Sequence, residues 1–326
     1  MITIITVTYN SRQEIERFLL SLSEMLKRDS RELETRVWDN ASSDGTRQYL
    51  STAQQILPAL KMSVSLSYEN VGLSRAINSQ IASSKGELIL LCNPDVEFSD
   101  EFSDLVDFAS SHPELGVVPD LKNPDGTTQR SVHRRFPSFT RIFFEYTSFG
   151  RYVSRLLPFV REDYKYSNTK FTAPSIIEQP GGTFLLLHRE TVRKLSREGK
   201  LYDEKFPVFW NDVDLSMKAR VEHVKFVIVP EVRIIHGFGH SVKKLENEKR
   251  LALFFGKLGL IGFADKWKLN PRAIQVVLFL DSILAVSLGF AARLVKRRSS
   301  ELDFADLERS MFVSRSRIMK FWCSIH

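Results

Sequence analysis

The stretch Glu87-Leu88-Ile89-Leu90-Leu91-Cys92-Asn93-Pro94-Asp95 is the most informative in this chain of 326 residues. Its very apolar first part predicts a strand over 87–92, and its last three residues end that strand with polar groups. Because a proline holds the residue before it in an extended conformation, we expect Asn93 and Asp95 to point off the edge of the sheet.

Three further strands are predicted upstream, over 2–8, 35–38 and 64–68, and helices over 12–27, 46–56 and 73–83 alternate with them. This alternation is typical of an α/β fold with right-handed crossovers. We therefore expect a Rossmann-like, mostly parallel sheet flanked by helices on both faces. Downstream, strands are predicted over 184–187 and 225–229, and a helix over 215–221.

Each of the four upstream strands ends in polar residues: Tyr9-Asn10, Asp39-Asn40, Glu69-Asn70 and Asn93-Pro94-Asp95. Ligands of open α/β sheets bind outside the carboxyl ends of the strands, so these endings predict one shared site. The alternative is that asparagine and aspartate are simply common in loops and caps.

Phosphate-binding glycine motifs are absent from the sequence. No GxGxxG follows the first strand and no GxxxxGK[ST] occurs, which disfavours a dinucleotide dehydrogenase and a P-loop kinase. A site edged with carboxylates can still hold a diphosphate through Mg²⁺, which takes one or two carboxylates plus phosphate oxygens. Asp95 is the obvious carboxylate for this role.

The composition of the chain indicates which kinds of ligand and which cellular compartment suit the protein. The chain has 46 basic and 39 acidic residues, a net charge of +7 that suits an anionic ligand, a membrane surface or nucleic acid. Its two cysteines, Cys92 and Cys323, form neither a disulfide framework nor a zinc pattern. The N-terminus has no basic region and no cleavage site, so we expect no signal peptide and a reducing cytosolic setting.

Six ordered motifs between residues 1 and 241 make the chain similar to glycosyltransferase family 2, the inverting enzymes of the GT-A fold, and to its rhamnosyltransferase-like branch. The motifs are Thr6-Val7-Thr8-Tyr9-Asn10, Trp38-Asp39-Asn40-Ala41-Ser42-Ser43-Asp44-Gly45, Glu69-Asn70-Val71-Gly72 continuing to Asn78, Leu91 to Asp95, Gly181-Gly182-Thr183-Phe184, and Phe209-Trp210-Asn211-Asp212-Val213-Asp214.

The resemblance implies a binding site for a nucleotide-diphosphate sugar and a divalent metal, Mg²⁺ or Mn²⁺. Asp95 and His236 would hold the metal, since the family's Asp-x-Asp is reduced here to Asn93-Pro94-Asp95. The alternative for His236 is a capping or core histidine. The residues that the resemblance assigns to the nucleotide are Thr8, Tyr9, Asn10, Asp39, Asp44, Asn70, Gly72, Arg75, Asn78 and Asn93.

The resemblance also implies a catalytic base. Inverting transfer needs a carboxylate that takes the proton of the acceptor hydroxyl, and the family's position falls on Asp212, with Asp214 structural. The alternative for Asp212 is a plain helix N-cap. Gly181, Gly182, Trp210 and Asn211 would face the donor sugar or acceptor, although the two glycines also suit a tight turn.

Basic and aromatic residues gather in 127–161 and again after Ser241, which favours docking on an anionic bilayer. The apolar segment 273–292 is bracketed by cations and interrupted by Asp281, so an interfacial or hairpin helix, a membrane span and a core helix all stay open. Residues 302–322 predict another amphipathic helix. We therefore divide the chain into a catalytic domain, 1–241, and a helical, membrane-associating region, 242–326.

Together these features predict an inverting glycosyltransferase that acts in cell-surface polysaccharide biosynthesis. By resemblance the donor is dTDP-L-rhamnose and the acceptor is a lipid-linked or polysaccharide hydroxyl. A UDP-hexose or galactofuranosyl donor and a non-catalytic, membrane-bound scaffold are the alternatives. We expect a peripheral protein on the cytosolic face of the plasma membrane, without a nucleic-acid partner; a homodimer is left open.

Overall fold

A computed structural model describes residues 1–29, 31–129, 132–157, 164–166, 169–237 and 246–297, with backbone alone over 246–255 and 285–297. The strands in these ranges are β1 (Ile2–Thr8), β2 (Leu33–Asp39), β3 (Met62–Leu66), β4 (Leu88–Cys92), β5 (Val96–Glu97), β6 (Leu115–Lys122), β7 (Ser175–Ile177), β8 (Phe184–His188) and β9 (Lys225–His236). The helices are α1 (Arg12–Leu26), α2 (Thr46–Ile56), the short 3-10 helix η1 (Pro58–Leu60), α3 (Leu73–Ser83), α4 (Phe102–Ser111), α5 (Phe139–Tyr146), α6 (Ser148–Leu156), α7 (Arg189–Leu195), α8 (Asn211–Val221), α10 (Glu246–Lys266) and α11 (Pro271–Arg297).

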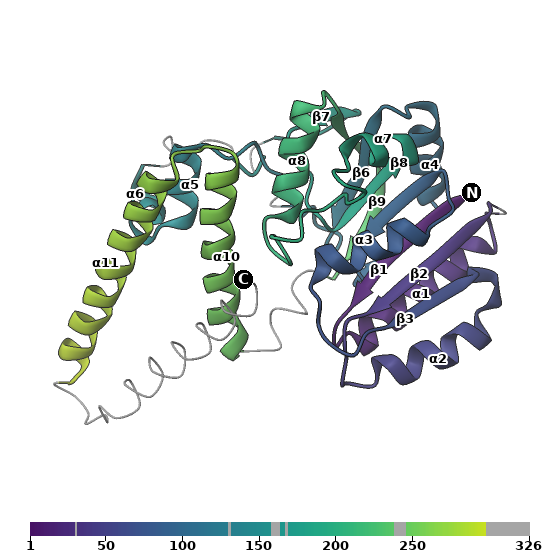
Figure 1. The fold of residues 1–326 in the computed structure, drawn as a ribbon, viewed down its shortest axis with the longest axis horizontal. Coiled ribbons are helices and arrows are strands. Elements are labelled where there is room, and N and C mark those ends of the chain that lie inside the picture. The colour runs from purple at the N-terminus through teal and green to yellow at the C-terminus, as the bar shows by residue number, and fades with distance from the viewer. Residues whose placement is uncertain (30, 130–131, 158–163, 167–168, 238–245, 298–326) are drawn as a thin grey trace.

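One twisted sheet forms the centre of the larger, α/β part of the molecule, on the right in Figure 1. The strands β3, β2, β1 and β4 are parallel neighbours, as the sequence predicts. The expectation of a mostly parallel sheet is wrong beyond β4, because β8 runs antiparallel between β4 and β6, and β5 and β7 run antiparallel to β9. The sheet is therefore mixed. The ends of β1, β2, β4 and β9 and the start of β8 lie at one edge.

Helices cover both faces of the sheet, which confirms the expected layering. On one face α1, α2 and α4 bury side chains such as Phe18, Leu50 and Leu105 against the strands. On the other face α3, α7 and α8 do the same, for example with Ile77 and Leu215. Two separate apolar cores thus hold the sheet edge in a fixed shape.

Two elements are longer than predicted, and both differences affect the site. The helix α8 begins at Asn211 rather than at residue 215, which places Asp212 inside its first turn. The strand β9 continues past residue 229 to His236, because its second half pairs with the end of β6 and with β5. This extension carries His236 to the edge of the sheet next to Asp95.

A smaller helical unit, made of α5, α6, α10 and α11, lies beside the sheet (Figure 1). Its core contains Ile142, Phe263 and Ile274, and it also includes Phe206 and Trp210 from the loop before α8. Two of its helices, α5 and α6, come from the predicted catalytic domain 1–241. The helical unit is therefore not confined to the C-terminal region, and the boundary at residue 241 stays a prediction.

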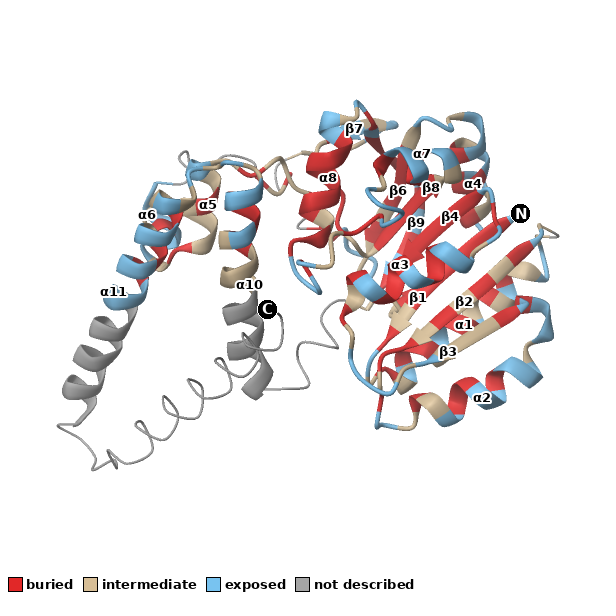
Figure 2. Ribbon diagram, viewed as in Figure 1, coloured by how far each residue is buried: buried red, intermediate tan, exposed pale blue. Residues whose placement is uncertain are grey.

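The helix α11 is packed on one face and exposed on the other (Figure 2). Ile274, Leu278 and Asp281 are buried, whereas Phe279 and Leu280 are more than half exposed. From the sequence alone, we expect the charge of Asp281 to oppose insertion of the segment 273–292 into a membrane. Its Oδ1 instead accepts hydrogen bonds from the backbone N–H groups of Ser148 at 2.6 Å and Phe149 at 3.1 Å, at the N-terminus of α6. A carboxylate is stabilised there by the helix dipole.

In the described part of the chain, no helix combines the length and the apolarity that a membrane crossing needs. The predicted helix over 302–322 lies outside the described residues.

Not every residue of the basic segment 127–161 lies on the surface of the protein. His133 is buried, and burial lowers its pKa to about 4. That residue belongs to the wall of the candidate site.

Candidate active site

The loop after β2 is built around the carboxylate of Asp39, which is buried. Its Oδ1 accepts a hydrogen bond from Thr8 Oγ1 at 3.2 Å, and its Oδ2 accepts one from the backbone N–H of Ser42 at 3.1 Å. The guanidinium Nε of Arg47 lies 3.7 Å from Oδ2. The predicted pair of Thr8 and Asp39 is thus brought together, with the carboxylate directed into the protein, where it fixes the loop.

Asn10 and Asp44 join the loops after β1 and β2. Asn10 has a left-handed φ of 50°, and its Oδ1 accepts from the backbone N–H of Ser43 at 2.8 Å. Asp44 accepts from Thr46 Oγ1 at 2.5 Å and from the backbone N–H of Arg12 at 3.1 Å. Burial tends to raise the pKa of Asp44, but these hydrogen bonds outweigh burial and lower that pKa. The two loops therefore form one rigid rim.

Asn40 connects this rim to the loop after β3; it belongs to one of the four polar strand endings, but the sequence did not assign it a role of its own. Its Nδ2 donates to Asn70 Oδ1 at 2.7 Å, and its Oδ1 accepts from the backbone N–H of Val71 at 2.9 Å. Its position directly after Asp39 in the second motif was the signal that could have identified it. Tyr9, at 43% exposure, is accessible on the same rim.

Gly72 and Asn78 anchor a distant loop, residues 201–207, rather than leaving a free surface. Gly72 has a φ of 84°, and a Cβ added to it would lie 2.8 Å from Cβ of Pro207. Asn78 Nδ2 donates to the carbonyl of Tyr202 at 2.9 Å, and Asn78 Oδ1 accepts from the N–H of Tyr202 at 2.9 Å. This clamp is a role that the nucleotide assignment of Asn78 did not predict. Arg75, between them, is exposed.

Asp95 and His236, the two predicted metal ligands, lie next to each other. His236 Nε2 is 3.3 Å from Asp95 Oδ1, and both residues are buried or nearly so. The strands bring them together, because Val96 pairs with His236 and the N–H of Gly237 donates to the Asp95 carbonyl at 2.8 Å. Asn93 lies at the same edge, where its N–H donates to the Thr183 carbonyl at 2.9 Å.

Gln129 orients the histidine, and sequence reasoning did not identify it. Its Oε1 lies 2.8 Å from His236 Nδ1, and its Nε2 donates to the His236 carbonyl at 2.8 Å. A hydrogen bond of this kind on one ring nitrogen typically directs the other toward a metal. Within the described residues no group of three or more His, Cys, Asp and Glu side chains could hold a metal. One carboxylate and one imidazole fit a cation that also binds phosphate oxygens.

Asp212 lies in the first turn of α8. The N-cap of that helix is Trp210, with a left-handed φ of 71°, so the plain N-cap interpretation of Asp212 is wrong. Asp212 Oδ1 accepts from the N–H of Val213 at 2.9 Å. Among the described residues, nothing donates a hydrogen bond to its Oδ2.

Gly181 and Gly182 form the wall opposite α8. A Cβ added at Gly182 would lie 3.4 Å from Asp212 Cβ, and one at Gly181 would lie 2.5 Å from Val132 Cγ1. Neither glycine has a left-handed φ. Close approach of Val132, rather than turn geometry, therefore explains the glycine at position 181, whereas a Cβ at Gly182 would make ordinary van der Waals contact with Asp212.

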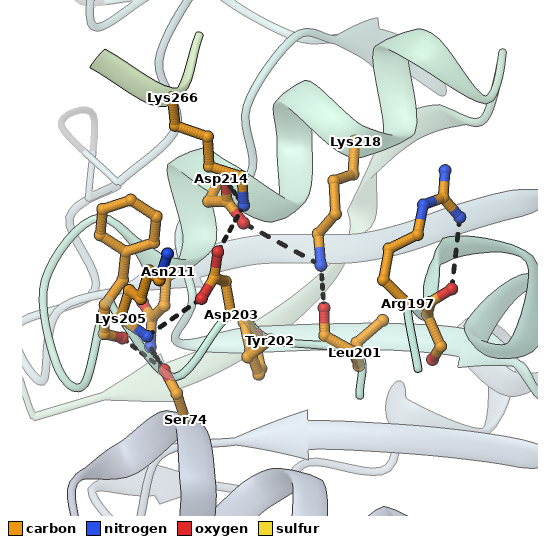
Figure 3. Close-up of polar contacts among 12 residues, drawn as sticks. Ser74, Arg197, Leu201, Tyr202, Asp203, Lys205, Asn211, Asp214, Lys218 and Lys266 are labelled. Carbon is orange, nitrogen blue, oxygen red and sulfur yellow. Dashed lines mark hydrogen bonds and ion pairs between the residues drawn. The ribbon is translucent and has the colours of Figure 1, made fainter. Parts of the chain in front are cut away.

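Asp214, in the first turn of α8, has a structural role, as the sequence predicts (Figure 3). Its Oδ1 accepts from Trp267 Nε1 at 2.9 Å and lies 2.7 Å from Lys266 Nζ, which also contacts Asp203 at 2.7 Å. Lys218 Nζ lies 4.0 Å from Asp214 Oδ2, and burial lowers the pKa of Lys218 to about 8. This network joins α8 to the end of α10.

Asn211 and Trp210 hold the start of α8 in place. Asn211 Nδ2 donates to Ser74 Oγ at 3.2 Å, and its Oδ1 accepts from the N–H of Asp212 at 2.8 Å. The Trp210 ring packs between Tyr146 and Phe263, and its Nε1 donates to the Gly256 carbonyl in α10 at 2.8 Å. The buried indole is thus a packing residue of the helical unit.

The chain is similar to known proteins over most of its length. Residues 3–189, more than half of the chain, match the family model described as Glycosyl transferase family 2. An N-acetylglucosaminyl-diphospho-decaprenol L-rhamnosyltransferase of Mycobacterium tuberculosis is 28% identical over 259 residues, which cover 74% of this chain and 77% of that relative.

Two solved structures share the fold at low identity. A mannosyltransferase from Pyrobaculum calidifontis, in complex with GDP-Man and Mn²⁺, has a TM-score of 0.52 and 17% identity, covering 96% of this chain and 79% of that one. GalNAc-T7 with UDP, GalNAc and Mn²⁺ has a TM-score of 0.51 and 15% identity, covering 72% of this chain and 43% of that one. The expected GT-A fold is thereby confirmed.

Proposed function

The chain belongs to glycosyl transferase family 2, and from this premise we propose that it transfers L-rhamnose from dTDP-L-rhamnose, with inversion, to a hydroxyl of a lipid-linked glycan. The transferred sugar and the acceptor class are supported by the mycobacterial relative, an L-rhamnosyltransferase acting on a diphospho-decaprenol sugar. A role in cell-surface polysaccharide synthesis follows from that acceptor class.

The arrangement of Asp212 is the observation that carries the proposal. Its Oδ2 has no hydrogen-bond donor among the described side chains and backbone groups, and the bare backbone of Gly182 leaves room next to it. In an inverting reaction this carboxylate takes the proton of the acceptor hydroxyl as that oxygen attacks the anomeric carbon. The fixed start of α8 keeps the carboxylate in one position during the attack.

We assign the diphosphate of the donor to the side of Asp95 and His236. A Mg²⁺ or Mn²⁺ ion bound there would neutralise charge on the leaving diphosphate. Gln129 holds the imidazole in the orientation needed for such a ligand. The nucleotide itself is assigned to the rim formed by the loops after β1, β2 and β3, where Tyr9 and Arg75 are the accessible side chains.

We further propose that the helical unit docks on the anionic bilayer at the cytosolic face of the plasma membrane, where a lipid-linked hydroxyl would lie. Exposed apolar side chains cover α11 and α6, and exposed arginines accompany them. The residues concerned are Val276, Phe279, Leu280, Ile283, Phe149, Tyr152 and Leu156, with Arg151, Arg155 and Arg272.

Vesicle binding tests the docking. We expect the protein to sediment with vesicles of phosphatidylcholine and phosphatidylglycerol more than with phosphatidylcholine alone. The double variant F279S/L280S should bind less, whereas I56S, at an equally exposed isoleucine on α2, should bind like the wild type. Equal binding of all three proteins would exclude this surface.

Thermal denaturation with a panel of nucleotide sugars tests the function itself, because a ligand that binds only the folded state raises the melting temperature. We expect dTDP-L-rhamnose with Mn²⁺ to give the largest shift, and EDTA to reduce it. A larger shift with a UDP-hexose or a galactofuranosyl donor would assign another donor. No shift with any nucleotide diphosphate would indicate a non-catalytic scaffold.

A further inference from the structure

Arg134 lies on the site wall next to the two glycines, although the sequence grouped it with surface cations. Its backbone N–H donates to the Gln179 carbonyl at 2.9 Å, and the Gln179 N–H donates to the Arg134 carbonyl at 2.9 Å. The neighbouring His133 accepts at Nδ1 from the N–H of Gly181 at 3.4 Å. These contacts fix Arg134 relative to Gly182 and therefore to Asp212.

The side chains of this wall have polar atoms without partners inside the protein. Nε of Arg134 and both amide atoms of Gln179 are closed off from solvent and make no hydrogen bond. Gln179 is fully buried. Leaving such groups unsatisfied costs about 1–3 kcal/mol each, so their presence points to a polar ligand that satisfies them.

Arg134 is held as a cation near the predicted base. Burial alone would lower the pKa of its guanidinium, but interactions with the nearby Tyr146 and with the carboxylate of Asp212 outweigh burial and raise that pKa. No carboxylate of the described residues lies within ion-pair distance of it. Arg135, the next residue, differs: it lies 3.4 Å from Glu178 Oε1 and stacks over the Tyr166 ring at 4.6 Å.

An arginine without a carboxylate partner is suited to bind a phosphate group through two parallel hydrogen bonds. Two diphosphates take part in the proposed reaction, that of the donor and that of the lipid-linked acceptor. The donor diphosphate is assigned to Asp95 and His236. A sugar linked to a lipid through a diphosphate presents that group across one sugar ring from the reacting hydroxyl, which Asp212 would contact.

We propose that Arg134, assisted by the Gln179 amide, binds the diphosphate of the lipid-linked acceptor. This inference rests on the proposed function, since it requires an acceptor hydroxyl at Asp212. It makes Arg134 a specificity-determining residue: the site would select acceptors that carry a diphosphate next to the sugar. Donor binding would not depend on it.

Two acceptors that differ only in the diphosphate test the proposal. One is N-acetylglucosaminyl diphosphate on a short isoprenyl chain, and the other is octyl N-acetylglucosaminide. For R134Q we expect the KM of the diphosphate acceptor to rise about 10- to 100-fold, as for loss of a charge-assisted contact. The KM of the donor and of the octyl glycoside should stay unchanged. R135Q is the matched control and should alter none of the three.

Other outcomes would overturn the inference. A higher KM for the donor in R134Q would mean that Arg134 binds the donor diphosphate. An equal loss of kcat with both acceptors would mean that Arg134 acts on the proposed base, Asp212. If R134Q melts well below the wild type, R134K keeps the charge and should show an intermediate KM for the diphosphate acceptor.

A binding measurement separates this inference from the proposed function. With the nucleotide site saturated by dTDP and Mn²⁺, geranyl diphosphate should raise the melting temperature of the wild type and of R135Q but not of R134Q. A protein that binds no nucleotide contradicts the proposed function. The protein could instead bind nucleotide while geranyl diphosphate fails to raise its melting temperature, or raises that of R134Q by the same amount. Either result contradicts this inference alone.

Discussion

The indole Nε1 of Trp267 donates a hydrogen bond of 2.9 Å to Oδ1 of Asp214, and this contact joins the end of α10 to the helix that carries Asp212. Asp214 is fully buried, and Lys266 contacts the same oxygen at 2.7 Å. The helical unit is therefore bound to the site by polar contacts as well as by its apolar core.

Replacing Trp267 with phenylalanine removes this hydrogen bond and keeps an aromatic ring. We expect the free energy of unfolding to fall by about 1–3 kcal/mol, because the buried carboxylate loses one donor but retains Lys266. Urea denaturation measures the change. K268Q, which removes the exposed ion pair of Lys268 with Asp265, should cost less than about 0.5 kcal/mol. Equal effects of the two substitutions would show that the indole hydrogen bond contributes nothing.

Asp212→Asn should abolish transfer while preserving donor binding. The amide cannot accept the acceptor proton, so we expect kcat to fall by several powers of ten, within the range known for loss of a general base and its charge. Labelled-sugar transfer measures kcat, and the nucleotide-induced melting shift reports binding. Asp104→Asn, an exposed aspartate in the first turn of α4, is the matched control and should retain full activity. Near-normal turnover of D212N would remove Asp212 from the mechanism.

Gln129→Leu should weaken divalent-metal binding by about 10- to 100-fold, the usual effect of removing the partner of a metal-bound histidine. Asp95→Asn should weaken it further, since the only carboxylate of the pair is lost. Titration of Mn²⁺ in the presence of dTDP, followed by electron paramagnetic resonance, measures the affinity. If Q129L binds Mn²⁺ like the wild type, the hydrogen bond between Gln129 and His236 does not support a metal site.

Stability should fall in acid because of His133. Burial lowers its pKa from 6.5 to about 4, so between these values the unfolded state binds a proton that the folded state does not. The contribution is intact above pH 6.5 and decreases as the pH drops to about 4, by up to about 3 kcal/mol at about 1.4 kcal/mol per pKa unit. Urea denaturation at pH 7.5 and pH 4.5 measures it.

The variant H133N removes this titrating group, so its loss of stability between the two pH values should be smaller than that of the wild type. H223N changes an exposed histidine instead and should follow the wild type. The same acid sensitivity in H133N would assign the effect to other groups.

Gly72→Ala and Gly126→Ala separate backbone strain from steric contact. Both glycines have a φ near 83°, with values of 84° and 82°, but only Gly72 would bring a Cβ to 2.8 Å from Pro207. We expect G126A to cost about 1–2 kcal/mol from the left-handed backbone alone, and G72A to cost more. Urea denaturation measures both. Equal costs would mean that the Pro207 loop moves aside freely.

The part of the fold that could be predicted is the part that local pattern determines. The strands before residue 92 and the helices between them alternate in apolar and polar character, and the structure agrees within a few residues. The direction of β8 could not be predicted, because an apolar run such as 184–187 has the same pattern in either direction. The length of β9 depends on β5 and β6, which no local pattern reveals.

The candidate site likewise depends on contacts between segments that are distant in the sequence. Asp95 and His236 are separated by 141 positions, and their contact depends on the register of β5 with β9; the family resemblance suggested the pair, and the strand register explains it. Gln129 and Arg134 lie in a segment whose composition resembles a surface. Their roles depend on hydrogen bonds to His236 and Gln179, so sequence pattern alone could not assign them.

Trp210 stands two positions before Asp212, and its indole is hydrogen-bonded to α10 rather than to the sheet. The start of α8, which carries the proposed base Asp212, is therefore held by the helical unit as well as by the sheet, whereas the rim proposed for the nucleotide is formed by loops of the sheet alone. A displacement of α10 would move the start of α8, and with it Asp212, relative to the loops after β1 and β2. If Asp212 is the base, binding of a ligand or a membrane to the outer helices would change kcat while leaving nucleotide affinity the same.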